Sequence, residues 1–84
     1  MYSVYDKAVK AFMPPFFARS DAEAVRSFRD ACEDGKHQFS RHASDYALFK
    51  LAAFDDETSL VSVIETGPER IAEAMSFVPP PEGA

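Results

Sequence analysis

The chain has 84 residues, of which 46% are hydrophobic, 13% aromatic and 27% charged, and this length indicates one domain of marginal size. The single cysteine excludes an internal disulfide and, with the lack of a recognisable signal peptide, favours a reducing cytosol. No apolar run approaches the roughly 18–20 residues that span a bilayer, so we expect a soluble cytoplasmic protein that does not contact membranes.

The net charge of −5 argues against non-specific adhesion to polyanions, but the charges are unevenly distributed. Residues 1–54 hold eight Lys/Arg and seven Asp/Glu, a balance of +1. Residues 55–84 hold one arginine and seven acids, a balance of −6. Any surface that binds a nucleic acid is therefore expected on the first two thirds of the chain.

Two strands are predicted before the first helix. Residues 1–6 are rich in β-favouring side chains and indicate the first strand. Pro14 and Pro15 lack the amide hydrogen that a sheet ladder needs. The second strand therefore lies at a sheet edge or begins only at Phe16.

A helix is predicted over residues 21–34. Ser20 and Glu23 have the spacing of a capping box, and apolar residues recur with helical periodicity behind them. Gly35 suits the position just after a helix C-terminus.

A hairpin is predicted next, with strands at 46–54 and 58–65 around the acidic residues 55–57. The turn contains no glycine, which disfavours a tight mirror-type turn and favours a longer loop.

The stretch 66–75 reads as a second helix. Thr66 and Glu69 again have capping-box spacing, and Pro68 falls in the first turn, where proline is tolerated. Three consecutive prolines then predict a flexible C-terminal tail over 79–84.

The elements therefore predict a single α+β domain over 1–78, in ββαββα order. It would be a four-stranded, mainly antiparallel sheet with two helices on one face. The hairpin's first strand is apolar on both sides, and the side without a charge is the better candidate for the helix-covered core: Ala47, Phe49, Leu51 and Ala53. The other side would then be exposed and need a partner: Tyr46, Leu48, Lys50, Ala52 and Phe54.

The residues do not predict an enzyme, a metal site or a cofactor. There is no nucleophile elbow, cysteine–histidine signature or glycine-rich phosphate loop. Cys32, His37 and His42 are evenly spaced but lack the close pairing of structural zinc ligands. The acidic turn lacks the ligand spacing and the glycine of a calcium loop, so a solvated turn is the better interpretation.

Three segments in the same order and spacing, "SVYDKA", "PPFFARSDAEAVRSFRDA" and "DYALFKLAAFDDETSLV", resemble the small non-structural protein of gokushoviruses. These viruses (Gokushovirinae) are single-stranded DNA bacteriophages of the Microviridae. One departure is Ser59, which stands where the resemblance leads us to expect glycine.

The resemblance implies a phage-encoded DNA-binding protein in the host cytoplasm. Such a protein would act in viral DNA replication, when duplex synthesis gives way to single strands for packaging. The resemblance supplies no binding residues, so these are inferred from residue chemistry alone.

A groove for single-stranded DNA combines cations with flat rings on which bases stack. We expect Arg19, Lys36, Arg41 and Lys50 to meet phosphates and Lys7 and Lys10 to extend the basic edge. Tyr46 and Phe16 would offer stacking surface. Single-stranded DNA is expected in preference to duplex, with modest affinity that falls steeply with salt.

The alternative is a homodimeric interaction module. In that hypothesis Tyr46, Leu48 and Phe54 form the dimer interface, and the protein binds the phage replication initiator or a host factor without touching DNA. The two hypotheses are compatible, because a dimer would join two weak basic patches.

Overall fold

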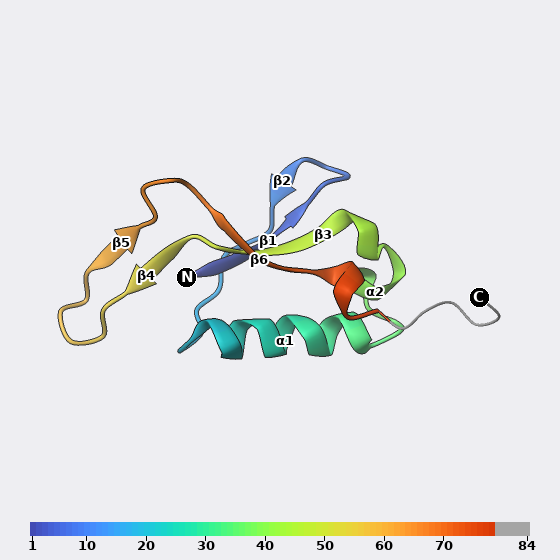
Figure 1. The fold of residues 1–84 in the computed structure, drawn as a ribbon, viewed down its shortest axis with the longest axis horizontal. Coiled ribbons are helices and arrows are strands. Elements are labelled where there is room, and N and C mark those ends of the chain that lie inside the picture. The colour runs from blue at the N-terminus through green and yellow to red at the C-terminus, as the bar shows by residue number, and fades with distance from the viewer. Residues whose placement is uncertain (79–84) are drawn as a thin grey trace.

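The structure is a computed structural model that describes residues 1–78, so the predicted tail at 79–84 lies outside the described residues. It contains six strands and two α-helices joined by turns (Figure 1). The strands are β1 (Tyr2–Asp6), β2 (Ala11–Phe12), β3 (Tyr46–Lys50), β4 (Ala52–Phe54), β5 (Val61–Val63) and β6 (Glu69–Glu73). The helices are α1 (Asp21–Glu33) and α2 (Gln38–Arg41), with 3-10 turns η1 (Ala43–Asp45) and η2 (Ala74–Ser76).

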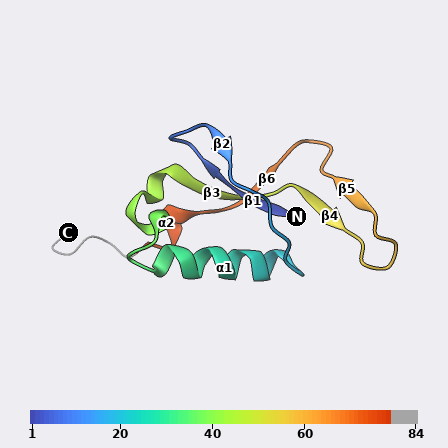
Figure 2. The same ribbon diagram turned by 180° about the vertical axis from the view of Figure 1, so that it is seen from behind.

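The main sheet has four antiparallel strands in the order β2-β1-β3-β6. Helix α1 runs along one side of it, and β2 lies on the other side of β1 and β3 in both views (Figures 1 and 2). Strands β4 and β5 form a separate two-stranded sheet that projects past the sheet as an arm. The prediction of an α+β fold with a four-stranded antiparallel sheet and two helices is therefore confirmed, but the predicted order of the elements is not.

Helix α1 is confirmed within one residue of its predicted end. The Ser20 side chain accepts a hydrogen bond from the Glu23 amide at 3.1 Å, as the capping box requires. Ala24, Phe28 and Cys32, one helical turn apart, are buried against the sheet.

The predicted second helix is wrong. Gly67 has φ +91°, a left-handed conformation that interrupts any helix beginning at Thr66, and its amide donates to the Ile64 carbonyl. The residues that follow form β6, which pairs with the free edge of β3. The helix propensities of ordinary residues differ by no more than about 0.7 kcal/mol per residue. Backbone pairing with a sheet edge outweighs such small differences.

The second helix of the structure falls instead between α1 and β3. Helix α2 begins after His37, whose Nδ1 accepts a hydrogen bond from the Phe39 amide at 3.1 Å. Phe39 is buried and contacts Phe28, with ring centroids 5.4 Å apart. This short helix therefore closes the end of the core next to α1.

The assignment of the two faces of β3 is inverted. Tyr46 and Leu48 point toward α1 and are buried in the core, whereas Phe49 lies on the opposite face. The presence of Lys50 on the same side as Tyr46 misled the prediction. Lys50 sits at the strand end, where its long side chain reaches Asp21 and solvent, so its charge does not mark an exposed face.

The predicted hairpin of 46–54 and 58–65 is confirmed only near its turn, where β4 pairs with β5 across a longer loop as expected. Residues 46–50 form β3 instead, which pairs with β1 and β6 and not with β5. The Asp55 carboxylate accepts hydrogen bonds from the amides of Glu57 and Thr58, and the first of these lowers its pKa. Ser59 has φ 64°. The position at which glycine was expected therefore does adopt the left-handed conformation that favours glycine.

Within residues 1–78, no helix has the length and apolar character to cross a membrane.

Candidate nucleic-acid interface

Three aromatic rings gather on the sheet face opposite α1, which we call the open face. The Tyr5 ring lies 4.8 Å from Phe12 and 6.2 Å from Phe49, and the Phe12 and Phe49 rings are 5.5 Å apart, all between centroids. All three pairs are edge-to-face, so the rings do not hide one another's flat surfaces completely. The Phe12 side chain is 43% exposed.

Strand pairing explains why these rings meet. Tyr5 is directly opposite Phe12 on β2, and Phe49 is directly opposite Ser3 on β1, two residues from Tyr5. Paired residues of antiparallel strands share a face, as do residues two apart on one strand. The cluster therefore follows from register alone.

Two cations flank the rings. Arg70 is paired with Phe49 across β3 and β6, and its Nη1 lies 3.0 Å from Glu73 Oε1. Lys7 Nζ lies 3.6 Å from the same Oε1. All three charged side chains keep substantial contact with solvent. The open face thus combines aromatic surface with two cations that share one carboxylate.

The predicted phosphate-binding residues do not form one surface. Arg19 and Lys50 lie at the N-terminal end of α1, whereas Lys36 and Arg41 lie beyond its C-terminal end. The 13 residues of α1 separate the two pairs by about 20 Å. Arg19, Lys36 and Arg41 are exposed.

Of the residues expected to extend the basic edge, Lys7 belongs to the open face through its contact with Glu73. Lys10 is exposed in the β1–β2 turn, with φ 57°.

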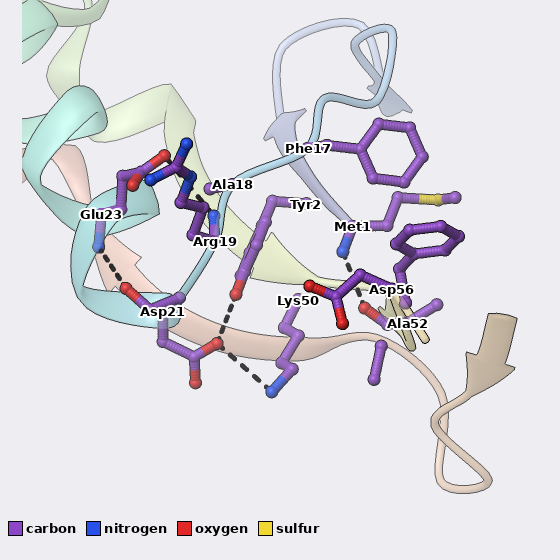
Figure 3. A pocket seen from close by; sticks show the side chains of 13 residues that line it. Met1, Tyr2, Phe17, Ala18, Arg19, Asp21, Glu23, Lys50, Ala52 and Asp56 are labelled. Atoms are coloured by element: carbon purple, nitrogen blue, oxygen red, sulfur yellow. Dashed lines mark hydrogen bonds and ion pairs between the residues drawn. The ribbon is translucent and has the colours of Figure 1, made fainter. Parts of the chain in front are cut away.

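Lys50 forms an ion pair at the start of α1. Its Nζ lies 3.2 Å from the Asp21 carboxylate, which also accepts a hydrogen bond from the Tyr2 hydroxyl (Figure 3). The Tyr2 bond, followed by Lys50, lowers the pKa of Asp21. Burial, followed by the bond to Asp21, raises the pKa of Tyr2 to about 12. Lys50 is therefore already paired, which weakens its case as a phosphate contact.

The two predicted stacking residues are also less available than expected. Tyr46 is buried, with its ring 4.7 Å from that of Phe39, and burial raises its pKa. Phe16 is half-buried, 5.9 Å from the Tyr2 ring. The prediction that Tyr46 offers an exposed stacking surface is wrong, because its face of β3 is the one that α1 covers.

The predicted dimer interface is likewise divided. Leu48 is fully buried and, like Tyr46, cannot contact a second chain through its side chain. Phe54, on the arm, is 51% exposed. Only Phe54 of the three predicted interface residues is available to a partner.

An open groove of about 1060 Å³ lies between the arm and the start of α1 (Figure 3). Phe17 and Phe54 stand on its wall with ring centroids 6.1 Å apart. Its cations are the N-terminal ammonium group, Arg19 and Lys50, and its acids are Asp21, Glu23 and Asp56. Three charges of each sign leave no net attraction for a polyanion, so the open face is the better candidate.

Cys32 and His37, two of the three evenly spaced residues weighed against a zinc site, contribute to the fold. Cys32 is buried in the core, where burial raises its thiol pKa to about 11, and His37 caps α2. No group of three or more His, Cys, Asp or Glu in the described part of the chain could hold a metal ion.

Sequence reasoning missed Tyr5, Phe12, Phe49 and Arg70 as site residues. Phe49 was assigned to the core because its side of β3 carries no charge, and Arg70 was assigned to a helix in the acidic third. The usable signal was the alternation of side chains along β1, which places Tyr5 on the other face of the strand from Tyr2 and Val4.

A family model described as "Phage ORF5 protein" matches residues 1–77. The matched range runs from β1 through η2, so the similarity concerns the whole described domain rather than one motif. No curated protein and no solved structure matches the chain.

Proposed function

The chain belongs to the Phage ORF5 protein family, and on that premise we propose that it is a non-enzymatic phage protein that binds single-stranded DNA on its open face. We further propose, from the resemblance to the gokushovirus protein, that it acts in the host cytoplasm at the change from duplex replication to single-strand synthesis and packaging. The binding itself is argued from the open face.

The observation that carries the proposal is the juxtaposition of three aromatic rings with two cations on one uncovered sheet face. Stacking on a protein ring contributes about 1–3 kcal/mol per base and is available only when bases are unpaired. Four-stranded antiparallel sheets that carry aromatic side chains on neighbouring strands are a recurring platform for such stacking. This chemistry favours single strands over duplex DNA.

The charge distribution supports modest affinity. The acidic residues 55–57 lie at the tip of the arm, away from β2 and the open face (Figure 1). Lys7 and Arg70 meet at the Glu73 carboxylate on this face, and Lys10 lies in the β1–β2 turn, two residues before Phe12. A site with so few cations makes few phosphate contacts, so its salt dependence is shallower than the steep fall expected from the sequence.

A second candidate function is protein association through the arm. Its exposed apolar side chains are Phe54, Leu60, Val61 and Val63. Apolar residues gathered on one projecting element favour an interface. This hypothesis replaces the interface predicted from Tyr46 and Leu48, and it is compatible with DNA binding at the open face.

Fluorescence anisotropy with labelled single-stranded and duplex oligonucleotides at two salt concentrations tests the proposal. We expect salt-sensitive binding that favours the single strand. Phe12→Ala should weaken it by about 1–3 kcal/mol, the contribution of one stacked base. Phe17→Ala removes an exposed phenylalanine outside the open face and should change the affinity little. Lack of binding at low salt, or equal effects of the two variants, would contradict the proposal.

Light scattering of the same samples tests the second candidate. A dimer that Phe54→Asp converts to a monomer, with unchanged DNA affinity per chain, would support association through the arm. A monomeric wild-type protein would contradict it.

A further inference from the structure

Glu73 Oε1 contacts both Lys7 and Arg70 on the open face, at 3.6 Å and 3.0 Å. Resting on the proposed function, we infer that Lys7 and Arg70 form a phosphate subsite that Glu73 occupies in the free protein. On binding, a phosphate of the single strand takes the place of the carboxylate.

A β-bulge builds this subsite. Leu48 pairs with Ala72 and Phe49 pairs with Arg70, so Ile71 is an extra residue on β6. In a regular strand, residues three apart point to opposite faces. The extra residue brings Arg70 and Glu73 to the same face, while Ile71 packs against the core.

The subsite lies where a backbone phosphate is needed. Arg70 is directly opposite Phe49, and Glu73 is directly opposite Ala47, which in turn pairs with Tyr5. A base stacked on the aromatic cluster therefore has its phosphate within reach of both cations. A guanidinium and an ammonium group bind phosphate oxygens as they bind carboxylate oxygens.

The exchange requires little reorganisation. Glu73 and both cations are partly exposed, and ion pairs of this kind contribute little to stability. A released carboxylate can be hydrated in place. Because the Glu73 carboxylate offsets one of the two positive charges in the free protein, a polyanion without stacked bases gains less there. Stacking therefore strengthens the case for the phosphate contact.

Glu73→Gln tests this competition, and Glu69→Gln is a matched control. Glu69→Gln removes the same charge from the same strand. Glu69, however, pairs with Lys50 and so lies on the α1 side of the sheet. With a labelled oligothymidylate at low salt, we expect Glu73→Gln to lower the dissociation constant about three- to tenfold. This is the size of effect expected when Lys7 and Arg70 are released from two exposed ion pairs. Glu69→Gln should change it less than about twofold, the effect of a distant charge.

Arg70→Gln provides a second readout. It should weaken binding and reduce the slope of log affinity against log salt by about 0.7, the value for one phosphate contact on a single strand. Equal effects of the two glutamate variants, or an unchanged slope in Arg70→Gln, would overturn the subsite. If the wild type binds and Phe12→Ala weakens it, the proposed function survives that result. If neither the wild type nor Glu73→Gln binds, the proposed function itself fails.

Discussion

Arg70 and Glu73 stand three residues apart on one strand, yet Arg70 Nη1 and Glu73 Oε1 meet at 3.0 Å on the same face of the sheet. The bulge at Ile71 produces this contact and leaves both side chains beside the aromatic cluster. The irregularity in β6 therefore determines the chemistry of the open face, because a regular strand would direct one of the two charges toward α1.

Leu48 is the central core residue of the sheet, with no exposed surface. Leu48→Ala should lower the free energy of unfolding by about 2–5 kcal/mol, because it removes buried methyl groups and leaves a cavity. Leu60→Ala makes the same chemical change at a side chain that is 65% exposed and should cost less than about 0.5 kcal/mol. Urea denaturation of both variants measures the difference, and similar losses would place the core elsewhere.

Gly67 should tolerate alanine less well than Gly35. Neither position has an atom within 4 Å of an added Cβ, so sterics outside the residue are equal. Gly67, however, has φ +91°, which costs an L-residue about 1–2 kcal/mol. Gly67→Ala should therefore lower the thermal midpoint distinctly and Gly35→Ala should not. Equal midpoints would contradict the left-handed turn that precedes β6.

The thiol of Cys32 should resist alkylation in the folded protein. It is fully buried, and burial raises its pKa to about 11, so the reactive thiolate is rare at neutral pH. Iodoacetamide should label it only as fast as the protein opens, and rapidly once urea unfolds the chain. Fast labelling without denaturant would show that α1 does not bury this side chain against the sheet.

Asp21 should give the protein an acid-dependent loss of stability. Its folded pKa is lowered below 3.8 by the Tyr2 hydrogen bond and Lys50, so the stabilisation is complete above the unfolded pKa. It is lost as the pH falls through the folded pKa. Because Asp21 is half exposed, the contribution should be under about 1 kcal/mol.

The measurement is the urea midpoint from neutral pH down to about pH 2. Asp21→Asn should start lower at neutral pH and lose less on acidification than the wild type. Parallel curves for the two proteins would show that the Tyr2–Asp21–Lys50 contacts do not form.

Local signals predicted the elements whose stability is local. The Ser20 cap and the spacing of Ala24, Phe28 and Cys32 identified α1 almost to the residue. The pairing of β4 with β5 was predicted from two apolar runs around an acidic loop, although not as a sheet of its own. In both cases the residues that determine the structure are neighbours in sequence.

Long-range pairing decided the elements that the sequence did not reveal. The residues of β6 follow Thr66, which has the spacing of a helix cap. They form a strand only because they pair with the free edge of β3. The choice between the two apolar faces of β3 depends on where α1 packs, which a charge at the strand end does not report. Since the open face consists of residues from β1, β2, β3 and β6, its composition could not be read before these pairings were known.

The most direct test of the account is a two-dimensional NMR titration of the isotope-labelled protein with an unlabelled oligothymidylate. We predict that the largest shift changes fall on Tyr5, Phe12 and Phe49 and on the Arg70 side chain. Changes confined to the groove around Phe17 and Phe54, or none at low salt, would contradict binding at the open face.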